Sequence, residues 1–362
     1  MDYGLFIMPL HPPARPVADT YDDDLQTIIS AEHLGYVEAW VGEHFTSPWE
    51  NIPCPDLLLA KAAGRTERIR LGTGVVLMPF HNPLEVALRF ATLDHLTRGR
   101  FMLGVGSGGI AGDRRAFGVD LSGPDAATLT REGIEIVEKA WAGEPFQYQG
   151  RFFTFDVPPA DATTGALLRP YQQPGPPIAI AGVSKNSAGL ALAGERGWIP
   201  MSTNFLQPDV LRQHWASVQA GAQRSGRTPS RRAWRIAREI YVAETHDAAV
   251  RDAREGGMGR AFREYMLPLV ASGPYGLQAF KPLEGNVPDE AVTVDYLIEN
   301  VWIVGTPDEC AARLRALHED VGGFGTVLMI GHDWHPDHRK WTRSLELFAE
   351  KVMPRLKDLR AE

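Results

Sequence analysis

Eight short, almost continuously apolar runs recur along the chain, each separated from the next by helix-like sequence. They lie at 3–8 and 36–41, and near 69–77, 100–105, 178–182, 197–201, 236–243 and 325–330. Runs that are apolar at nearly every position are typical of parallel strands with both faces covered. Periodicity alone would also fit an open doubly wound sheet, but eight strand–helix units favour an α/β fold of the (β/α)8 TIM barrel type.

The intervening segments carry helix start and stop signals. Asp19 or Thr20 is expected to cap the first helix, with the acidic residues 22–24 in its first turn, and Gly35 is expected to end it in a left-handed conformation. Two later helices begin with a capping residue, a proline and, three residues after the cap, a glutamate. These segments are Asn82-Pro83-Leu84-Glu85 and Thr306-Pro307-Asp308-Glu309.

The sequence contains no evident domain boundary, internal repeat or low-complexity tract. Its 362 residues, 44% of them hydrophobic, are expected to form a single barrel domain over 1–362. Three segments, at about 106–125, 144–177 and 256–300, exceed ordinary loop lengths. Six prolines between 155 and 177 favour an ordered loop or hairpin, and 258–270 is expected to be helical. All three follow strands and are predicted insertions at the C-terminal face of the strands, where barrel active sites lie.

Charge and cysteine content exclude several classes of protein. The chain has 37 basic and 45 acidic residues, a net charge of −8 and no strongly basic stretch, which argues against a nucleic-acid partner. Its two cysteines, Cys54 and Cys310, are too few for a disulfide framework or a cysteine zinc site. No basic leader precedes the first apolar run, and no apolar stretch approaches the roughly 18 residues that span a bilayer. We expect a cytoplasmic protein with no membrane partner.

A histidine stands at the end of the second predicted strand, in the segment Gly42-Glu43-His44. In a barrel the C-terminal ends of the strands face the active site, and an imidazole can transfer a proton near neutral pH. His44 is therefore the candidate catalytic residue. A structural histidine bonded to a backbone carbonyl explains the sequence equally well at this point.

Small residues follow the third, fourth and fifth predicted strands. Glycines within Leu71-Gly72-Thr73-Gly74-Val75 indicate either a ligand close to the backbone or tight packing inside the barrel. The segment Gly104-Val105-Gly106-Ser107-Gly108-Gly109 resembles a dinucleotide fingerprint only loosely. The segment Gly182-Val183-Ser184-Lys185-Asn186-Ser187 precedes a predicted helix, where hydroxyls and free amides can bind phosphate. Capping of that helix by Ser184 is the alternative.

The stretch after the last predicted strand is rich in potential metal ligands. It reads His332-Asp333-Trp334-His335-Pro336-Asp337-His338. Histidine and aspartate side chains at such spacing could bind a metal ion. A metal-dependent hydrolase barrel, however, would carry a His-x-His pair after its first strand, where only His11 lies, and His-Glu-x-x-His is absent. No catalytic metal is expected, and no nucleophile motif lies on a strand-to-helix turn.

The order of these motifs resembles that of the luciferase-like flavin-dependent monooxygenase superfamily over nearly the whole chain. The segments that carry the resemblance are Gly42-Glu43-His44, Leu71-Gly72-Thr73-Gly74, Gly99-Arg100-Phe101, Gly104 to Gly108, Ala116-Phe117-Gly118, Gly182-Val183-Ser184, Val304-Gly305-Thr306-Pro307-Asp308 and Ser344-Leu345-Glu346-Leu347. Two further segments are similar to limonene- and diketocamphane-monooxygenase-like members. These are Ser47-Pro48-Trp49-Glu50-Asn51-Ile52-Pro53 and Gly331-His332-Asp333-Trp334.

The resemblance implies that FMN binds at the top of the barrel, with His44 beside its reactive edge. A non-proline cis peptide would fall at Gly74–Val75, beneath the flavin ring. The implied cofactor-binding residues are Met8, Gly74, Val75, Ser107, Gly182, Val183, Ser184 and Ser187. Some members place a positive side chain where this chain has Ser107, so the phosphate charge would be neutralised from elsewhere. The candidates for that role are Lys185, Arg114 and Arg115.

The resemblance further implies a two-component monooxygenase that takes reduced FMN from a separate flavin reductase and uses O2. Its substrate would be a small, largely apolar terpenoid, ketone or hydrocarbon, and the protein a homodimer. Epoxidation, hydroxylation and Baeyer–Villiger oxidation are not distinguished. The alternatives are a deazaflavin-dependent dehydrogenase on the same barrel and a non-catalytic flavin-binding subunit. The neutral Ser107-Gly108-Gly109 loop favours FMN over the deazaflavin, and retention of His44 favours an enzyme.

Overall fold

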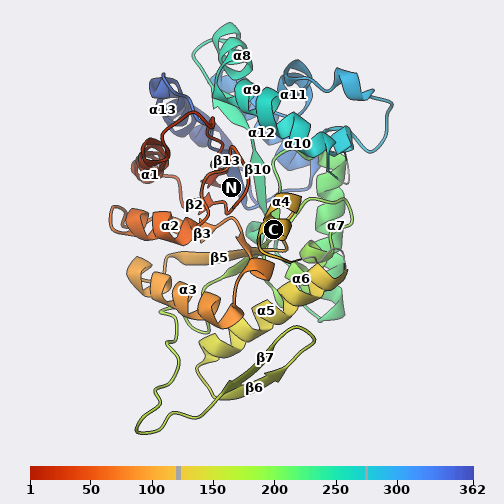
Figure 1. The fold of residues 1–362 in the computed structure, drawn as a ribbon. Helices are drawn as coiled ribbons and strands as arrows, with labels where there is room; N and C mark the ends of the chain where they lie inside the picture. The colour runs from red at the N-terminus through yellow and green to blue at the C-terminus, as the bar shows by residue number, and fades with distance from the viewer. Residues whose placement is uncertain (120–123, 274–275) are drawn as a thin grey trace.

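The computed structural model describes residues 1–119, 124–273 and 276–362, and eight parallel strands form a closed ring at its centre (Figure 1). The pairing of β3 with β5 closes the ring, so that none of these eight strands is an edge strand. In ring order the strands are β1 (Asp2–Ile7), β2 (Glu38–Val41), β3 (Arg70–Thr73), β5 (Phe101–Gly106), β8 (Ile178–Gly182), β9 (Ile199–Ser202), β10 (Arg235–Arg238) and β13 (Thr326–Ile330). Each overlaps one of the eight predicted runs, which confirms the (β/α)8 barrel.

Helices surround the ring of strands (Figure 1). They are α1 (Val17–His33), α2 (Pro55–Ala63), α3 (Pro83–Thr97), α4 (Ala111–Ala116), α5 (Pro124–Ala142), α6 (Ala188–Arg196), α7 (Pro208–Arg224), α8 (His246–Glu255), α9 (Gly257–Ala261), α10 (Leu267–Ala271), α11 (Val294–Asn300), α12 (Pro307–Asp320) and α13 (His338–Leu347). Within the described residues, no helix combines the length and apolar character needed to cross a membrane.

The three long segments contain their own elements. Segment 144–177 holds the antiparallel hairpin of β6 (Phe146–Gln149) and β7 (Thr154–Val157), outside α5 in Figure 1, and its proline-rich remainder contains no helix. Segment 256–300 contains α9 and α10, joined by the π-helical turn Phe262–Met266, where helix was predicted. Residues 120–123 and 274–275, which belong to the first and third segments, lie outside the described residues.

Most of the helix signals are correct, but the start predicted for the first helix is wrong. Helix α1 begins at Val17, directly after Pro16, so residues 22–24 lie beyond its first turn. The Thr20 hydroxyl donates to the Val17 carbonyl oxygen at 2.8 Å instead of capping the helix. Gly35 does take the predicted left-handed conformation, with φ of 89°. The predicted caps of α3 and α12 are also present, the second as a complete capping box.

Two of the predicted strands are interrupted where they approach the C-terminal face. The third consists of β3 and β4 (Val76–Leu77), and the predicted cis peptide at Gly74–Val75 lies between them. The seventh, expected to be continuous over 236–243, ends as β10 and resumes as β11 (Ile240–Val242). β11 pairs with β12 (Ile303–Gly305) outside the barrel, and Glu239 stands at the break.

The barrel interior is filled by side chains from opposite strands. Its cluster consists of Trp40, Met102, Ala179, Ile199, Met201, Ala237, Leu328 and Ile330. A Cβ on Gly72 would lie 2.3 Å from the Trp40 ring, and one on Gly74 would lie 2.8 Å from the Phe6 ring. Tight packing therefore accounts for both glycines of the third strand. Below the cluster, Arg235 makes a buried two-point ion pair with Glu38, with both N–O distances 3.1 Å.

Candidate active site

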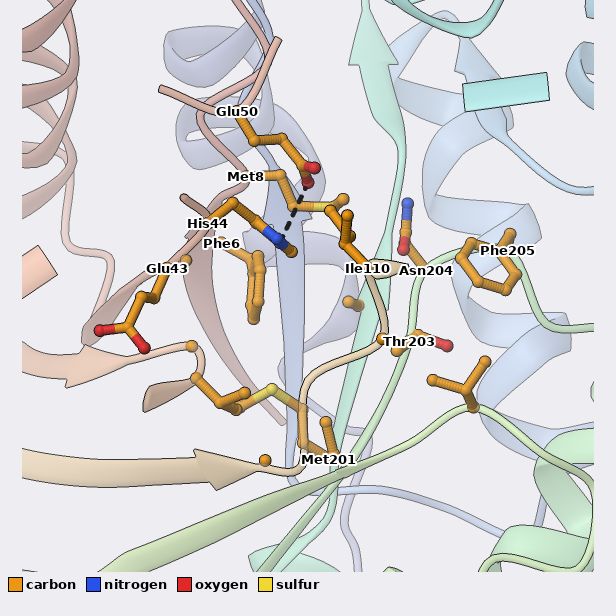
Figure 2. Close-up of a pocket in the computed structure, with 18 of the residues that line it drawn as sticks. Phe6, Met8, Glu43, His44, Glu50, Ile110, Met201, Thr203, Asn204 and Phe205 are labelled. Carbon is orange, nitrogen blue, oxygen red and sulfur yellow. Dashed lines mark ion pairs between the residues drawn. The ribbon is translucent and has the colours of Figure 1, made fainter. Parts of the chain in front are cut away.

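A cavity of about 480 Å³ lies at the C-terminal ends of the barrel strands (Figure 2). Its volume is within the range of small-molecule and cofactor sites. Segments that follow β1, β2, β3, β5, β8 and β9 form its walls, and one side is closed by residues 266–273, here called the roof segment. Much of the lining is apolar, including Phe6, Val75, Leu77, Ile110, Phe205, Met266, Leu269, Val270 and Ile330.

His44 lines this cavity, and its ring lies between two buried carboxylates. Its Nε2 is 3.3 Å from Glu50 Oε1, and its Nδ1 is 3.9 Å from Asp113 Oδ2, which is beyond hydrogen-bond distance. The side chain of His44 is 24% exposed, whereas those of Glu50 and Asp113 are 2% and 0% exposed. The ring makes no hydrogen bond to a backbone carbonyl of the described residues, so the alternative of a carbonyl-bonded structural histidine finds no support.

The two carboxylates determine the charge state of His44. Burial lowers the pKa of His44, but Glu50 and then Asp113 outweigh burial, so that this pKa is raised above its ordinary value. For Asp113, burial raises the pKa, but the hydrogen bonds that its carboxylate accepts outweigh burial. The pKa of Asp113 is therefore lowered below its ordinary value. The arrangement favours a protonated imidazole that faces an apolar space. Such a group can donate a proton to a reacting atom and take it back.

Both carboxylates are held by partners from other loops. The Tyr265 hydroxyl donates to Glu50 Oε2 at 2.5 Å and accepts a hydrogen bond from Ser47 at 2.8 Å. Asp113, on α4, accepts hydrogen bonds from the backbone N–H and the hydroxyl of Thr46 at 2.7 and 2.6 Å. Tyr265 belongs to the π-helical turn just before the roof segment, and such turns are frequent at functional sites. The roof is thereby connected to His44 through Glu50.

The sequence analysis did not identify Glu50, Asp113 or Tyr265 as functional residues. Glu50 lies in a segment quoted for the family resemblance, and the other two lie in long segments recognised only by length. No sequence spacing connects His44, Asp113 and Tyr265. Asp113 lies beside His44, and Tyr265 bonds to Glu50, only because the loops that carry them fold over the barrel. The only available signal was an acidic residue close to His44 in the sequence, and it applied to Glu43 as well as to Glu50.

Five of the eight predicted cofactor-binding residues line the cavity. These are Met8, Gly74, Val75, Ser107 and Val183. The exposed Ser107 follows β5, and its hydroxyl oxygen accepts a hydrogen bond from Thr130 at 3.2 Å. Val183 is 43% exposed and lines the cavity.

The other three predicted residues lie around the N-terminus of α6, next to Val183 but outside the cavity lining. Ser187 caps α6 by accepting the Leu190 N–H at 3.2 Å, so the alternative in which Ser184 caps this helix is wrong. The Ser184 carbonyl oxygen instead accepts from His214 Nε2 at 2.9 Å. Gly182 packs against Ser187, because a Cβ on this glycine would lie 3.0 Å from the serine hydroxyl.

A second polar group lines the cavity on the side away from His44. Asn204 follows β9 and is 3% exposed, and its side-chain amide nitrogen donates to Glu239 Oε1. Glu239 is fully buried, and its Oε2 has no hydrogen-bond partner within the described parts of the chain. Burial raises the pKa of Glu239 to about 7. The sequence analysis identified neither residue. Glu239 lies within 236–243, which was predicted to be one continuous strand, and Asn204 lies in the loop after β9.

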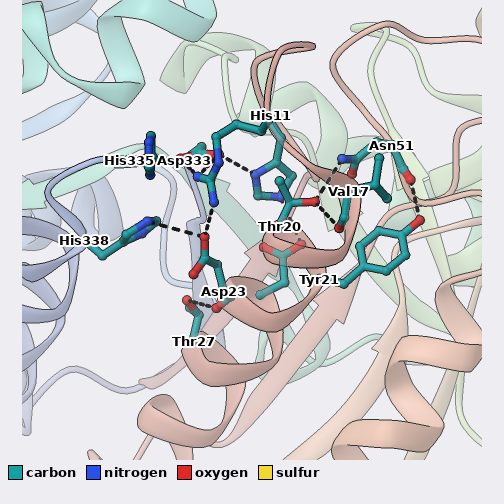
Figure 3. A network of polar contacts seen from close by, with 12 residues as sticks. His11, Val17, Thr20, Tyr21, Asp23, Thr27, Asn51, Asp333, His335 and His338 are labelled. Carbon is teal, nitrogen blue, oxygen red and sulfur yellow. Dashed lines mark hydrogen bonds and ion pairs between the residues drawn. The ribbon is translucent and has the colours of Figure 1, made fainter.

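Two residues of the histidine-rich stretch after β13 belong to a network of ion pairs and hydrogen bonds with residues that follow β1 (Figure 3). Asp333 accepts from His11 Nδ1 at 2.8 Å and pairs with Arg15 at 2.7 Å. His338 lies 3.4 Å from Asp23, whereas His332 is buried with both ring nitrogens unpartnered among the described residues. Across residues 1–119, 124–273 and 276–362, no three histidine, cysteine or acidic side chains are grouped so as to hold a metal ion.

Comparison with known proteins shows extensive similarity. The family model described as luciferase-like monooxygenase matches residues 1–322. The chain is 31% identical to 2,5-diketocamphane 1,2-monooxygenase 1 of Pseudomonas putida, over 99% of both chains. It is 31% identical to limonene 1,2-monooxygenase of Rhodococcus erythropolis, over 98% of this chain and 86% of that protein.

A solved structure extends the similarity to three dimensions. It is the oxygenating constituent of the 3,6-diketocamphane monooxygenase of Pseudomonas putida, a type II Baeyer–Villiger monooxygenase in complex with FMN. This structure superposes with a TM-score of 0.91 at 30% identity, over 98% of both chains. Together with the closed barrel and the cavity at its C-terminal face, these matches settle the family. The chain belongs to the luciferase-like monooxygenase family.

Proposed function

We propose that this protein is the oxygenating component of a two-component, FMN-dependent monooxygenase that acts on a small, largely apolar substrate with O2. The observation that carries the proposal is the apolar cavity into which a single histidine, held by two buried carboxylates, projects. Family membership and relatives named as terpenoid monooxygenases support the same reaction class.

The residues around the cavity fit FMN. Val75 and Phe6 offer an apolar surface for a flat ring system, and Gly106, Gly108 and Gly109 leave the neighbouring loop after β5 with little side-chain bulk. The N-terminus of α6 suits a phosphate group, because its first N–H groups and the positive end of its dipole favour anions. We assign Met8, Gly74, Val75, Ser107, Gly182, Val183, Ser184 and Ser187 to FMN binding, with Lys185, Arg114 and Arg115 as candidate countercharges. Reduced FMN, when bound, supplies the electrons with which O2 is activated.

The chain itself contributes proton control and exclusion of water. His44 donates or holds a proton at the ring nitrogen that faces the cavity, and Glu50 and Asp113 stabilise its charged form. The roof segment and the apolar walls exclude water, which strengthens these electrostatic interactions and suppresses side reactions. The hydrogen bond from the Tyr265 hydroxyl keeps Glu50 in place.

We further propose a homodimer, a separate flavin reductase as partner and a cytoplasmic location. Leu57 on α2 and Leu96 on α3 are 68% and 58% exposed on neighbouring helices, which suits a buried interface between two copies. The relative of known structure is named as the oxygenating constituent, which supports a reductase on another chain. A single-domain organisation over 1–362 is supported by the Met1 amino group, which donates to the Leu359 carbonyl oxygen at 3.0 Å.

The test is titration of the purified protein with FMN and with the deazaflavin, each in oxidised and reduced form. Reduced FMN should bind more tightly, and mixing that complex with O2 and a bicyclic ketone or alkene should give an oxygenated product. Preference for the deazaflavin, with hydride transfer and no oxygenated product, would refute the proposal. Sedimentation of the wild type and of Leu57→Glu tests the dimer, which this change should dissociate.

A further inference from the structure

Asn204 and His44 occupy opposite walls of the barrel mouth. His44 follows β2 and Asn204 follows β9, and in the ring of eight strands β2 and β9 are four places apart in either direction. Figure 2 shows the two side chains well separated, with Ile110 between them in that view. Near Asn204, Phe205 and the roof segment contribute apolar surface, and Ser202 and Thr203 contribute two further polar side chains.

The other polar side chains of this wall are already engaged. The Ser202 hydroxyl bonds with His214 Nδ1 and with the Trp234 ring N–H, both at 2.9 Å. The Thr203 hydroxyl donates to the Gly182 carbonyl oxygen at 3.4 Å. In contrast, Oδ1 of Asn204 accepts no hydrogen bond from the described residues, while its Nδ2 donates to Glu239. One end of this amide is therefore left for a ligand.

Glu239 holds Asn204 from behind the cavity wall. It stands at the break between β10 and β11, where its carbonyl oxygen accepts the Ile303 N–H at 2.9 Å. Arg238 secures the same loop, because its guanidinium donates to the backbone carbonyl oxygens of Asn204 and Leu206 at 2.7 and 2.5 Å. These contacts fix the backbone at Asn204 and place its side-chain amide against Glu239. The remaining freedom of the amide is a 180° flip that exchanges its oxygen and its nitrogen.

We propose that Asn204 is the residue that recognises a single neutral oxygen function on an otherwise apolar substrate, and that Glu239 decides which end of the Asn204 amide faces that oxygen. The proposal rests on the function proposed above and assigns a polar contact within its substrate site. With Glu239 ionised, Nδ2 bonds to the carboxylate and Oδ1 accepts from a substrate hydroxyl. With Glu239 protonated, its hydroxyl donates to the amide oxygen of the turned Asn204, and the amide nitrogen donates to a substrate carbonyl.

The surroundings allow Glu239 to change its protonation state near neutral pH. Burial is the main cause that raises its pKa to about 7, and Arg238 is the charged neighbour that opposes this effect. The pKa of Arg238 is lowered to about 10 by its own burial, so it stays charged in this range. His332 follows the neighbouring strand β13, and burial lowers its pKa to about 3, so it stays neutral. The remaining titratable groups of the cavity lie with His44 on the opposite wall.

The experiment measures binding of a hydrocarbon, an alcohol and a ketone that share one bicyclic skeleton. Calorimetry is performed on the FMN-free protein and on the protein loaded with oxidised FMN, from about pH 6 to about pH 8. One neutral hydrogen bond should make the oxygenated ligands bind roughly two- to tenfold more tightly than the hydrocarbon. The alcohol-to-ketone affinity ratio should rise with pH in the wild type and stay flat in Glu239→Gln, which keeps the shape but cannot ionise.

Asn204→Leu should remove the advantage of the oxygenated ligands while affinities for the hydrocarbon and for FMN stay unchanged. Asn204→Ser gives a second test if the leucine variant does not fold. The matched control is Gln207→Leu, because this nearby buried amide donates to the Phe280 carbonyl oxygen at 2.9 Å and does not line the cavity. That variant should keep the wild-type ratios.

Equal weakening of all three ligands in Asn204→Leu, or weakened FMN binding alone, would overturn the assignment of Asn204. If the alcohol-to-ketone affinity ratio still depends on pH in Glu239→Gln, the role of Glu239 is overturned. The titrating group would then be one of those near His44 on the opposite wall. Failure of the wild type to bind FMN would refute the proposed function instead, and the ratios in the FMN-free protein would still test Asn204.

Discussion

Replacing His44 with alanine removes the one imidazole that faces the cavity between two buried carboxylates. If this group handles the proton of the reaction, product formation should fall by about a hundred- to ten-thousand-fold, the range for loss of a general acid or base. Flavin affinity should change little, because the proposed phosphate site at the N-terminus of α6 follows β8, which is separated from β2 by two strands of the ring. Electrons from reduced FMN should then reach O2 without oxygenating the substrate, so hydrogen peroxide should replace the product.

The cost of this substitution in stability is predictable from the same contacts. Glu50 keeps the Tyr265 hydroxyl and Asp113 keeps two bonds from Thr46 after the imidazole is lost. Neither carboxylate is left without a donor, so we expect the free energy of unfolding to fall by about 1–3 kcal/mol rather than by the larger penalty of an isolated buried charge. The folded population therefore stays large enough for the kinetic measurement.

The assay compares oxygenated product with hydrogen peroxide in His44→Ala and wild type, with reduced FMN supplied chemically. His44→Gln is the matched control, because glutamine can donate to Glu50 but cannot carry a titrating proton. His44→Gln should be more stable than His44→Ala, but it should still release hydrogen peroxide instead of oxygenating the substrate. Glu50→Gln should move the pH dependence of coupling to lower pH, because Glu50 is the main contact that raises the pKa of His44. Normal coupling in His44→Ala would show that the histidine is structural.

Three further outcomes follow from the structure. Ser187→Ala should lower the free energy of unfolding by about 1 kcal/mol, through loss of the α6 cap, and weaken FMN binding; melting curves and flavin titration measure the two effects. Glu38→Leu should destabilise the barrel by about 3–5 kcal/mol, measured by denaturant unfolding, because Arg235 would stay buried without its partner. Burial lowers the pKa of His11, but the neighbouring aspartates raise it to about 9 overall, so its contribution to stability is full below pH 6.5 and should disappear as pH rises to about 9. His11→Gln should flatten that part of the unfolding profile, and a wild-type profile already flat there would contradict the assignment.

The barrel was predictable because its strands are specified locally. Each of the eight apolar runs overlaps a strand of the ring, and glycine and proline signals mark the helix ends at Gly35, Asn82 and Thr306. The start of α1 was predicted wrongly because the acidic residues after Asp19 serve tertiary contacts. Asp24 binds His11 and Asp23 binds Arg15, so the position of these carboxylates does not indicate where the first turn of α1 lies.

The predictions for the site depended on the position of His44 at the end of the second predicted strand and on the resemblance to the luciferase-like family. His44 was recognisable because position on a barrel strand fixes the direction of a side chain. The groups that determine its chemistry were not, because Asp113, which lies beside His44, and Tyr265, which bonds to Glu50, come from segments far apart in the sequence. Glu239 was hidden for a different reason. Its neighbours on both sides have ordinary strand character, and only the pairing of β11 with β12 shows that the ladder breaks there.

The distribution of polar groups in the cavity follows from the cost of burying them. An unpaired buried polar group costs more than its hydrogen bond contributes, so an apolar cavity can carry polar side chains only where the wall behind them supplies partners. Glu50 and Asp113 serve as such partners for His44, and Glu239 does so for Asn204. The space between the two walls is apolar and is closed by the roof segment. We therefore expect a substrate with one polar end to bind in a defined direction, with its oxygen at Asn204 and its apolar body between that wall and His44.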